Sequence, residues 1–170
     1  MINVLLILSV IHSNFCEEIY TKAIKLQPSE KNIVVCELLL EDAIQENVPI
    51  DVILALAFEE TRMTPQPNPN PWGCVGPLQI KVEYWCYGKS LDKCDTYHDG
   101  VKAIKYYLKK FPPLTKSICF YNDARKKKCI KSKGYKTKFV EGFLRYQRII
   151  SSVLKKDEYQ TLREHSSVTL

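Results

Sequence analysis

The stretch that decides the fold is VPIDVILALAFEETRM, residues 48–63. Its proline is well placed in a first helical turn, where the N–H that proline lacks would have no partner. The residues that follow are mostly apolar and contain no helix breaker, so we expect a helix over residues 49–63. This helix ends in two adjacent glutamates, Glu59 and Glu60, which are unusual neighbours for an apolar run.

Both glutamates continue an apolar face of the helix. Each lies three, four and seven positions after an apolar side chain, so helical periodicity does not choose between Glu59 and Glu60. A carboxyl group beside apolar side chains has a raised pKa and can stay protonated near neutral pH as a general acid. The alternative is that both are solvated, or pair with Arg62, at the helix end.

The rest of the chain predicts a mainly α domain. TPQPNPNPWG, residues 64–73, has four prolines and is incompatible with a helix. Residues 76–97 are mixed and predict short helices or a small β element. Periodicity and composition predict further helices over residues 17–27, 33–46, 99–111, 117–123 and 139–154. The result is a single domain with long, cysteine-stapled loops.

Composition limits the possible partners. The chain has 170 residues, of which 45% are hydrophobic, so it can bury a core and is not a disordered protein. Its net charge of +6 favours anionic partners. ARKKKCIKSKGYKTK, residues 124–138, has eight Lys or Arg in 15 positions. No recognised nucleic-acid module surrounds it, so we expect a solvated loop that attracts anionic polymers and no nucleic-acid partner, although a small basic nucleic-acid-binding protein is an alternative.

The N-terminus has the pattern of an export signal. MINVLLILSVI, residues 1–11, is shorter than the roughly 20 residues that span a bilayer, so we expect no stable membrane span. It fits the apolar part of a signal peptide, although no Lys or Arg precedes it. We assign residues 1–16 to the signal, 17–154 to the domain and 155–170 to a polar tail. Alternatives are a buried N-terminal element or a retained signal anchor.

The chain contains seven cysteines. Cys16 lies at the processing boundary, and the other six are Cys36, Cys74, Cys86, Cys94, Cys119 and Cys129. An even set in a small exported chain predicts disulfides. We expect the pairs Cys86–Cys94 and Cys119–Cys129 to close short loops, which leaves Cys36–Cys74 as the third pair. The chain has no C-x-x-C knuckle, so we expect no metal, and nothing predicts another cofactor.

Three segments, in order, resemble motifs of soluble lytic transglycosylases and goose-type lysozymes. Residues 48–63 resemble the family's Val-Pro start, Ala-rich helix and Glu-Ser-x-Phe. Gly-Pro-Leu-Gln-Ile, residues 76–80, resembles Gly-Leu-Met-Gln-hydrophobic, and Tyr121-Asn122 resembles the Tyr-Asn of a later motif. The resemblance covers about residues 45–150. Thr61 in place of Ser, and Asp123 in place of Ala, are departures that leave the exact substrate contacts open.

The resemblance implies a lysozyme-like fold and a catalytic role for Glu60, because an ungapped match from Val48 puts Glu59 one residue too early. The implied substrate is the β-1,4 bond between N-acetylmuramic acid and N-acetylglucosamine in peptidoglycan. Glu60 would act as acid and then as base, giving a 1,6-anhydro product without a second carboxylate. Alternatives are a hydrolytic lysozyme, whose base the sequence does not identify, or an inactive wall-binding protein.

The resemblance also implies a set of substrate-binding residues. They are Thr61, Gly76, Leu78, Gln79, Ile80, Tyr121 and Asn122. Tyr121 would hydrogen-bond and orient Glu60, whereas the Thr61 hydroxyl would contact substrate or Glu60, or else bond an upstream carbonyl. Trp72, Tyr84 and Trp85 are candidates for sugar stacking, with core packing as the alternative. We expect Asp92, Asp95, Asp99 and Asp123 to be surface or capping residues. The expected protein is an exported monomer, in the cell envelope, outside the cell or on a virion, with glycan strands as partner.

Overall fold

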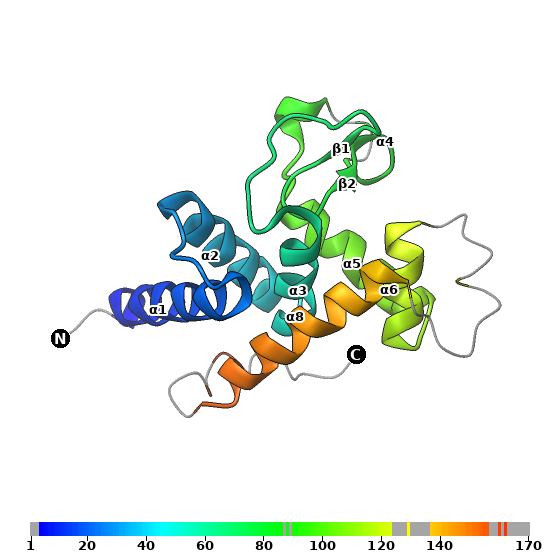
Figure 1. Ribbon diagram of the computed structural model, residues 1–170. Helices are drawn as coiled ribbons and strands as arrows, with labels where there is room; N and C mark the ends of the chain where they lie inside the picture. The colour runs from blue at the N-terminus through cyan, green and yellow to red at the C-terminus, as the bar shows by residue number, and fades with distance from the viewer. Residues whose placement is uncertain are drawn as a thin grey trace.

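The computed structural model describes residues 4–86, 88, 90–123, 129, 137–156, 160 and 162, without the side chains of residues 4–10. It is mainly helical with one small sheet, as predicted, and its loop-rich part around β1, β2 and α4 lies on one side of the helical body (Figure 1). The elements are α1 (Val4–Ile24), α2 (Glu30–Gln45), α3 (Ile50–Thr61), β1 (Cys74–Val75), β2 (Ile80–Lys81), α4 (Val82–Trp85), the 3-10 helix η1 (Leu91–Lys93), α5 (His98–Lys110), α6 (Leu114–Asn122) and α8 (Lys138–Leu154).

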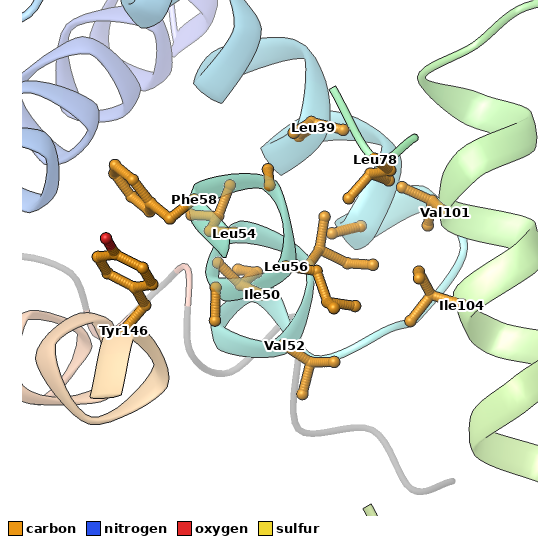
Figure 2. Packing of buried hydrophobic residues seen from close by; sticks show 14 of the residues in the cluster. Leu39, Ile50, Val52, Leu54, Leu56, Phe58, Leu78, Val101, Ile104 and Tyr146 are labelled. Carbon is orange, nitrogen blue, oxygen red and sulfur yellow. The ribbon is translucent and has the colours of Figure 1, made fainter. Parts of the chain in front are cut away.

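Helix α3 is the centre of the core. Its residues from Val52 to Phe58 are all buried, as expected for a helix that is apolar on every side. Helices α2, α5 and α8 surround it, and Phe58 stacks on Tyr146 of α8 with ring centroids 5.3 Å apart (Figure 2). Every other helix is therefore positioned relative to α3.

Helix α3 ends two residues before the predicted boundary at residue 63. Arg62 and Met63 have left-handed backbone angles, with φ of 58° and 59°. The Met63 amide donates back to the Ala57 carbonyl at 3.2 Å, the reversal that commonly closes a helix. The Asn32 side chain of α2 then donates to the Met63 carbonyl at 3.0 Å, which fixes the direction in which the chain leaves.

Helix α1 is longer than the predicted helix over residues 17–27. Phe15, Cys16 and Ile19 are fully buried in the core. Phe15 and Cys16 belong to the segment that the sequence assigned to a signal peptide, so removal of residues 1–16 would take both side chains out of this core. Among the described residues, none of the helices has both the length and the apolar composition needed to cross a membrane.

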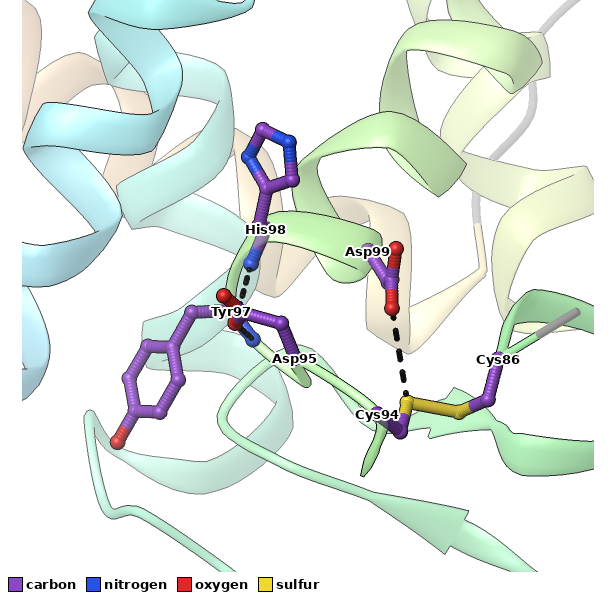
Figure 3. The surroundings of a disulfide bond; sticks show 6 residues. All are labelled: Cys86, Cys94, Asp95, Tyr97, His98 and Asp99. Atoms are coloured by element: carbon purple, nitrogen blue, oxygen red, sulfur yellow. Dashed lines mark hydrogen bonds between the residues drawn. A yellow bond between two sulfur atoms is a disulfide. The ribbon is translucent and has the colours of Figure 1, made fainter. Parts of the chain in front are cut away.

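Three disulfides cross-link the chain. The predicted pairs Cys86–Cys94 and Cys119–Cys129 are confirmed, and the first is drawn in Figure 3. The predicted pair Cys36–Cys74 is wrong. Cys36 bonds Cys16 instead, because packing of α1 on α2 brings their Cα atoms to 5.8 Å, and Cys74 remains a free thiol. Stable disulfides of this number are typical of proteins in oxidising compartments.

The predicted β element is a two-stranded antiparallel hairpin. Its register pairs Cys74 with Lys81 and Val75 with Ile80. Side chains alternate between the faces of a strand, so the buried pair Val75 and Ile80 turns toward the core, and Cys74 and Lys81 share the opposite face. A Cβ atom on Gly100 of α5 would lie 2.9 Å from Leu78, so this glycine allows α5 to pack closely beneath the hairpin.

Two predicted segments lie largely outside the described residues. Of the basic stretch 124–138, the structure describes Cys129, Thr137 and Lys138. Of the predicted polar tail 155–170, it describes residues 155, 156, 160 and 162. Leu162 is 2% exposed and belongs to the hydrophobic core, so at this position the chain is packed rather than frayed.

The cysteine pairing predicts a single free thiol. Alkylation of the unfolded, unreduced protein should add one label, which peptide mapping by mass spectrometry should place on Cys74. The variant Cys74→Ser should take up none. A label on Cys16 would instead show that Cys36 pairs with Cys74, and would contradict the observed arrangement of α1 and α2.

Candidate active site

A cavity of about 600 Å³ opens where the end of α3, the hairpin, α4, α5 and α6 meet. It gathers residues far apart in the sequence. Five predicted site residues line it: Glu60, Gln79, Ile80, Tyr121 and Asn122. The other lining residues are Asn70, Trp72, Cys74, Lys81, Tyr84, Trp85, Tyr107 and Asp123. The three segments that suggested a site in the sequence are therefore neighbours in space.

Glu60 is the acid of this cavity. Burial raises its pKa from 4.5 to about 8, and the nearby charge of Glu59 adds to the rise. The main cause is desolvation, because the carboxyl continues the apolar face of α3. At neutral pH most of the molecules therefore hold Glu60 as a neutral acid that has a proton to give.

Glu59 points toward a different part of the molecule. A Cβ atom on Gly142 of α8 would lie 2.2 Å from Glu59 Oε2, so the Glu59 carboxylate rests against the backbone of α8. Burial raises the pKa of Glu59, and Arg62 and Arg145 oppose that rise. The Arg62 Nη1 atom lies 4.0 Å from Glu59 Oε2. Adjacent helical residues point about 100° apart, and here that angle separates an interhelical carboxylate from the cavity acid, Glu60.

Tyr121 lies beside Glu60 but makes a different bond from the predicted one. Its hydroxyl donates to the Leu78 carbonyl rather than to Glu60. Burial raises the pKa of Tyr121 well above its usual value, and the charge of Glu60 raises it further. With its one proton directed at Leu78, the hydroxyl gives no hydrogen bond to a Glu60 carboxylate. This arrangement agrees with a raised pKa for Glu60.

The turn over residues 76–80 forms one wall. Gly76 has φ of 76°, and a Cβ atom there would lie 2.7 Å from Thr96, so a larger residue would both strain and crowd the turn. The Gln79 amide nitrogen atoms, backbone and side chain, donate to the Gly76 carbonyl at 3.1 and 3.0 Å. Asn70 donates to Gln79 Oε1 at 2.7 Å, so the Gln79 side chain is held in place at the cavity.

Thr61, Gly76 and Leu78 lie behind the cavity lining. The Thr61 hydroxyl is 3.2 Å from the Ala57 carbonyl and 3.0 Å from the Pro77 carbonyl, and it can donate to either. The first contact is the upstream-carbonyl bond that the sequence offered as an alternative. The second joins the end of α3 to the turn, so Thr61 holds Glu60 and Gln79 on one scaffold. A direct contact of Thr61 with substrate stays a prediction.

Aromatic side chains form the opposite wall and the rim. Trp85 packs against Tyr106 and Tyr107, with ring centroids 5.5 and 5.9 Å apart, so it is partly a packing residue. Trp72 and Tyr84 are instead 79% and 61% exposed. Their open ring faces are therefore available to a ligand that enters the cavity.

Four lining residues were missed in the sequence: Asn70, Cys74, Lys81 and Tyr107. Cys74 was assigned to a disulfide, and Asn70 lies in the proline-rich loop, where no periodicity places a side chain. Alternation across the hairpin would have put Cys74 and Lys81 on one face, had the register been known. The pKa of Cys74 is raised by burial and by Glu60 and lowered by Lys81, so its thiol senses both groups.

The other acids that the sequence singled out have separate positions. Asp95 accepts from the amides of Tyr97 and His98 at 3.2 and 3.1 Å, a capping role at the start of α5. Asp99 is buried, which corrects the surface position expected for it, and one of its oxygen atoms lies 3.7 Å from the disulfide sulfur of Cys94 (Figure 3). Asp92 is exposed on η1. Asp123 differs from the surface role expected for it, because it lines the same cavity as Glu60. Within the described residues, no cluster of three or more His, Cys, Asp or Glu side chains offers a metal site.

The burial of Glu60 predicts a pH-dependent stability difference for Glu60→Gln. A raised pKa means that the folded state holds this proton more tightly than the unfolded state, so stability falls as pH rises from about 4.5 through about 8. Glutamine has no charge to bury. The variant should therefore be close to the wild type in stability at pH 5, and its advantage in unfolding free energy should be up to roughly 4 kcal/mol larger at pH 9, at about 1.4 kcal/mol for each pKa unit. Urea unfolding at both pH values measures this, and Glu59→Gln is the matched control. An equal difference at pH 5 and pH 9 would contradict the raised pKa.

The chain has no match among the known proteins with which it was compared. No protein-family model, no curated protein and no solved structure matches it. The chemistry of the site is therefore argued from its own residues: a neutral carboxyl on the cavity floor, a wall of backbone turn and amide groups, and an open aromatic rim.

Proposed function

We propose that the protein is a peptidoglycan lytic transglycosylase with a lysozyme-like fold, and that it cleaves the β-1,4 bond between N-acetylmuramic acid and N-acetylglucosamine. The observation that carries this proposal is the half-buried Glu60, which lines the cavity and whose pKa of about 8 makes it a proton donor at neutral pH. The sequence resemblance, which assigned the proton chemistry to Glu60 rather than Glu59, supplies the substrate.

The first step breaks the glycosidic bond. Glu60 gives its proton to the bridging oxygen while the C1–O4 bond breaks, so the leaving sugar departs as a neutral alcohol. Positive charge develops at C1 and on the ring oxygen of the muramic acid. The carbonyl oxygen of the sugar's own N-acetyl group stabilises C1, so this step needs no carboxylate nucleophile from the protein.

The second step closes a ring. The C6 hydroxyl of the same sugar attacks C1 and forms the C1–O6 bond, and its proton passes to the Glu60 carboxylate. Glu60 is thereby returned to its starting form, and no water is consumed. One carboxyl serves as acid and then as base, which suits a cavity whose floor carries Glu60 while Glu59 is turned toward α8.

Two general features of the chain, its disulfides and its net charge, support an exported protein that acts on the cell envelope. Three disulfides suit an oxidising compartment. A net charge of +6 favours association with the anionic cell wall. Trp72 and Tyr84 at the rim offer flat apolar surfaces that fit sugar ring faces, and Gln79 and Asn122 offer amides for acetamido and hydroxyl groups.

Mass analysis of peptidoglycan digests tests the reaction. Wild type should release 1,6-anhydro-muropeptides. Glu60→Gln should lower the rate by at least about a hundredfold, because removal of a general acid typically costs that much. Glu59→Gln is the matched control and should keep most of the activity, because its carboxylate lies against α8. Loss of activity in Glu59→Gln with full activity in Glu60→Gln would show that the roles are reversed, and no digestion by wild type would refute the enzyme.

Hydrolysis is a second candidate outcome, and the position of Asp123 favours it. A hydrolytic lysozyme needs a base to position water, and Asp123 lines the cavity that contains Glu60. In that reaction water, rather than the C6 hydroxyl, would attack C1, and the product would be a reducing-end muramic acid.

The variant Asp123→Asn separates the two outcomes. If the enzyme is a transglycosylase, the variant should still give anhydro products, at a rate within about threefold of wild type because the residue touches no reacting atom. Reducing-end products from wild type that disappear in Asp123→Asn would establish hydrolysis with Asp123 as the base. Asp92→Asn, an exposed carboxylate on η1, is the control.

A further inference from the structure

Among the described residues that line the cavity, Lys81 is the one cation. Its charge has no role in the two steps proposed for Glu60. No carboxylate of the described residues forms an ion pair with Lys81, although the surface has such pairs elsewhere, for example between Lys105 and Glu46 at 3.1 Å. A lysine that lines a cavity without an internal partner is available to an anionic group of a ligand.

Lys81 lines the same cavity as the reacting carboxyl. It faces Cys74 across the hairpin, and Cys74 lines the cavity next to Glu60. The pKa of Cys74 is raised by burial and by the charge of Glu60 and lowered by Lys81, so both groups act on this thiol.

The ammonium group sits beside an open aromatic surface. Lys81 Nζ lies 5.5 Å from the centre of the Tyr84 ring, a cation–π distance that holds the side chain at the rim. Tyr84 is 61% exposed, and Trp72, also lining the cavity, is 79% exposed. A sugar ring that rests on these faces would bring its substituents within reach of the lysine.

We propose that Lys81, Tyr84 and Trp72 form a subsite for a sugar that carries a carboxylate, and that Lys81 selects this sugar over a neutral one. This inference rests on the proposed function, and it specifies that the cavity recognises a carboxylate of the substrate. Muramic acid differs from glucosamine by a lactyl ether, which ends in a carboxylate or continues into an acidic stem peptide. Both sources present the same chemistry to Lys81, an anion near the sugar whose C1 reacts.

Charge pairing of this kind acts mainly on selectivity. A neutral ligand leaves the lysine without a partner while its water is displaced, whereas an anionic ligand replaces that water with a charge-assisted hydrogen bond. Chitin-type chains of N-acetylglucosamine have the same backbone and acetamido groups but no carboxylate. They should therefore fit the aromatic rim and gain nothing from Lys81.

Intrinsic fluorescence offers a binding measurement that is independent of catalysis. The chain has two tryptophans, and both Trp72 and Trp85 line the cavity. Titrations use the full chain with Glu60→Gln, so that ligands bind without being cleaved. Three ligands are compared: glycan oligosaccharides stripped of peptides, which expose the lactyl carboxylate, the same oligosaccharides with stem peptides, and chitooligosaccharides of equal length.

Adding Lys81→Met should weaken binding of at least one carboxylate-bearing ligand about tenfold. Binding of the chitooligosaccharide should change by less than about twofold, because methionine keeps most of the apolar stem of the lysine. Lys109→Met is the matched control, an exposed lysine of α5 outside the cavity, and should change none of the three. Circular dichroism of each variant checks the fold, and Lys81→Gln repeats the test with a polar replacement.

The outcomes are distinguishable. Selective loss with the stripped glycan identifies the lactyl carboxylate, selective loss with the peptide-bearing glycan identifies a stem carboxylate, and either supports the proposal. Equal loss for neutral and anionic ligands, or no loss for any, overturns the role of Lys81 and leaves the proposed function standing. Failure of every glycan to change the fluorescence or to be cleaved by wild type overturns both.

Discussion

The structure depends on placing one carboxyl group at the end of a helix that is buried on every side. Helix α3 supplies the centre of the core through Val52–Phe58, and Glu60 continues it into the cavity. Desolvation makes a charge expensive there, and the carbonyl groups that face the C-terminal end of a helix add a negative potential. Both effects favour the neutral acid. The pKa of about 8 thus follows from how the chain packs and requires no special partner for Glu60.

The surrounding structure holds the Glu60 carboxyl in position and directs the nearby arginine side chains to Glu59 instead. Thr61 ties the helix end to the Pro77 carbonyl, and Tyr121 ties α6 to the Leu78 carbonyl, so both walls meet at the 76–80 turn. The two nearby arginines, Arg62 and Arg145, lower the pKa of Glu59 at the α8 side, and the pKa of Glu60 is set by burial and by Glu59. The disulfide Cys86–Cys94 closes the loop that follows α4.

Sequence analysis correctly predicted the elements that are determined by the residues within them. The apolar run of α3 and the periodic face of α8 are long and unambiguous, and short polar loops predicted two of the disulfides. The predictions were wrong or incomplete where contacts between elements far apart in the sequence determine the structure. The helical wheel could not separate Glu59 from Glu60, because the separation comes from α8, whose Gly142 leaves room for one carboxylate and not the other. Cys36 was wrongly paired with Cys74, because its true partner, Cys16, is set by packing of α1 on α2. The sequence also missed the positions of three cavity residues: Asn70 in a loop, Lys81 in a short strand and Asp123 at a helix end. In such segments hydrophobic periodicity is too short to predict which way a side chain points.

A raised pKa also bears on the second half of the proposed reaction. A carboxyl that holds its proton tightly is a weak acid, but once ionised it is a correspondingly strong base for a carboxylate. Desolvation therefore favours Glu60 first as the neutral donor to the glycosidic oxygen and then as the acceptor of the C6 proton, so one environment serves both steps. What this environment does not decide is the competition between the C6 hydroxyl and water. That competition is set at the rim, where the aromatic faces of Trp72 and Tyr84 would cover the bound sugar and where Asp123 would hold a water if one entered. The choice between ring closure and hydrolysis is thus a property of the cavity mouth rather than of the catalytic acid.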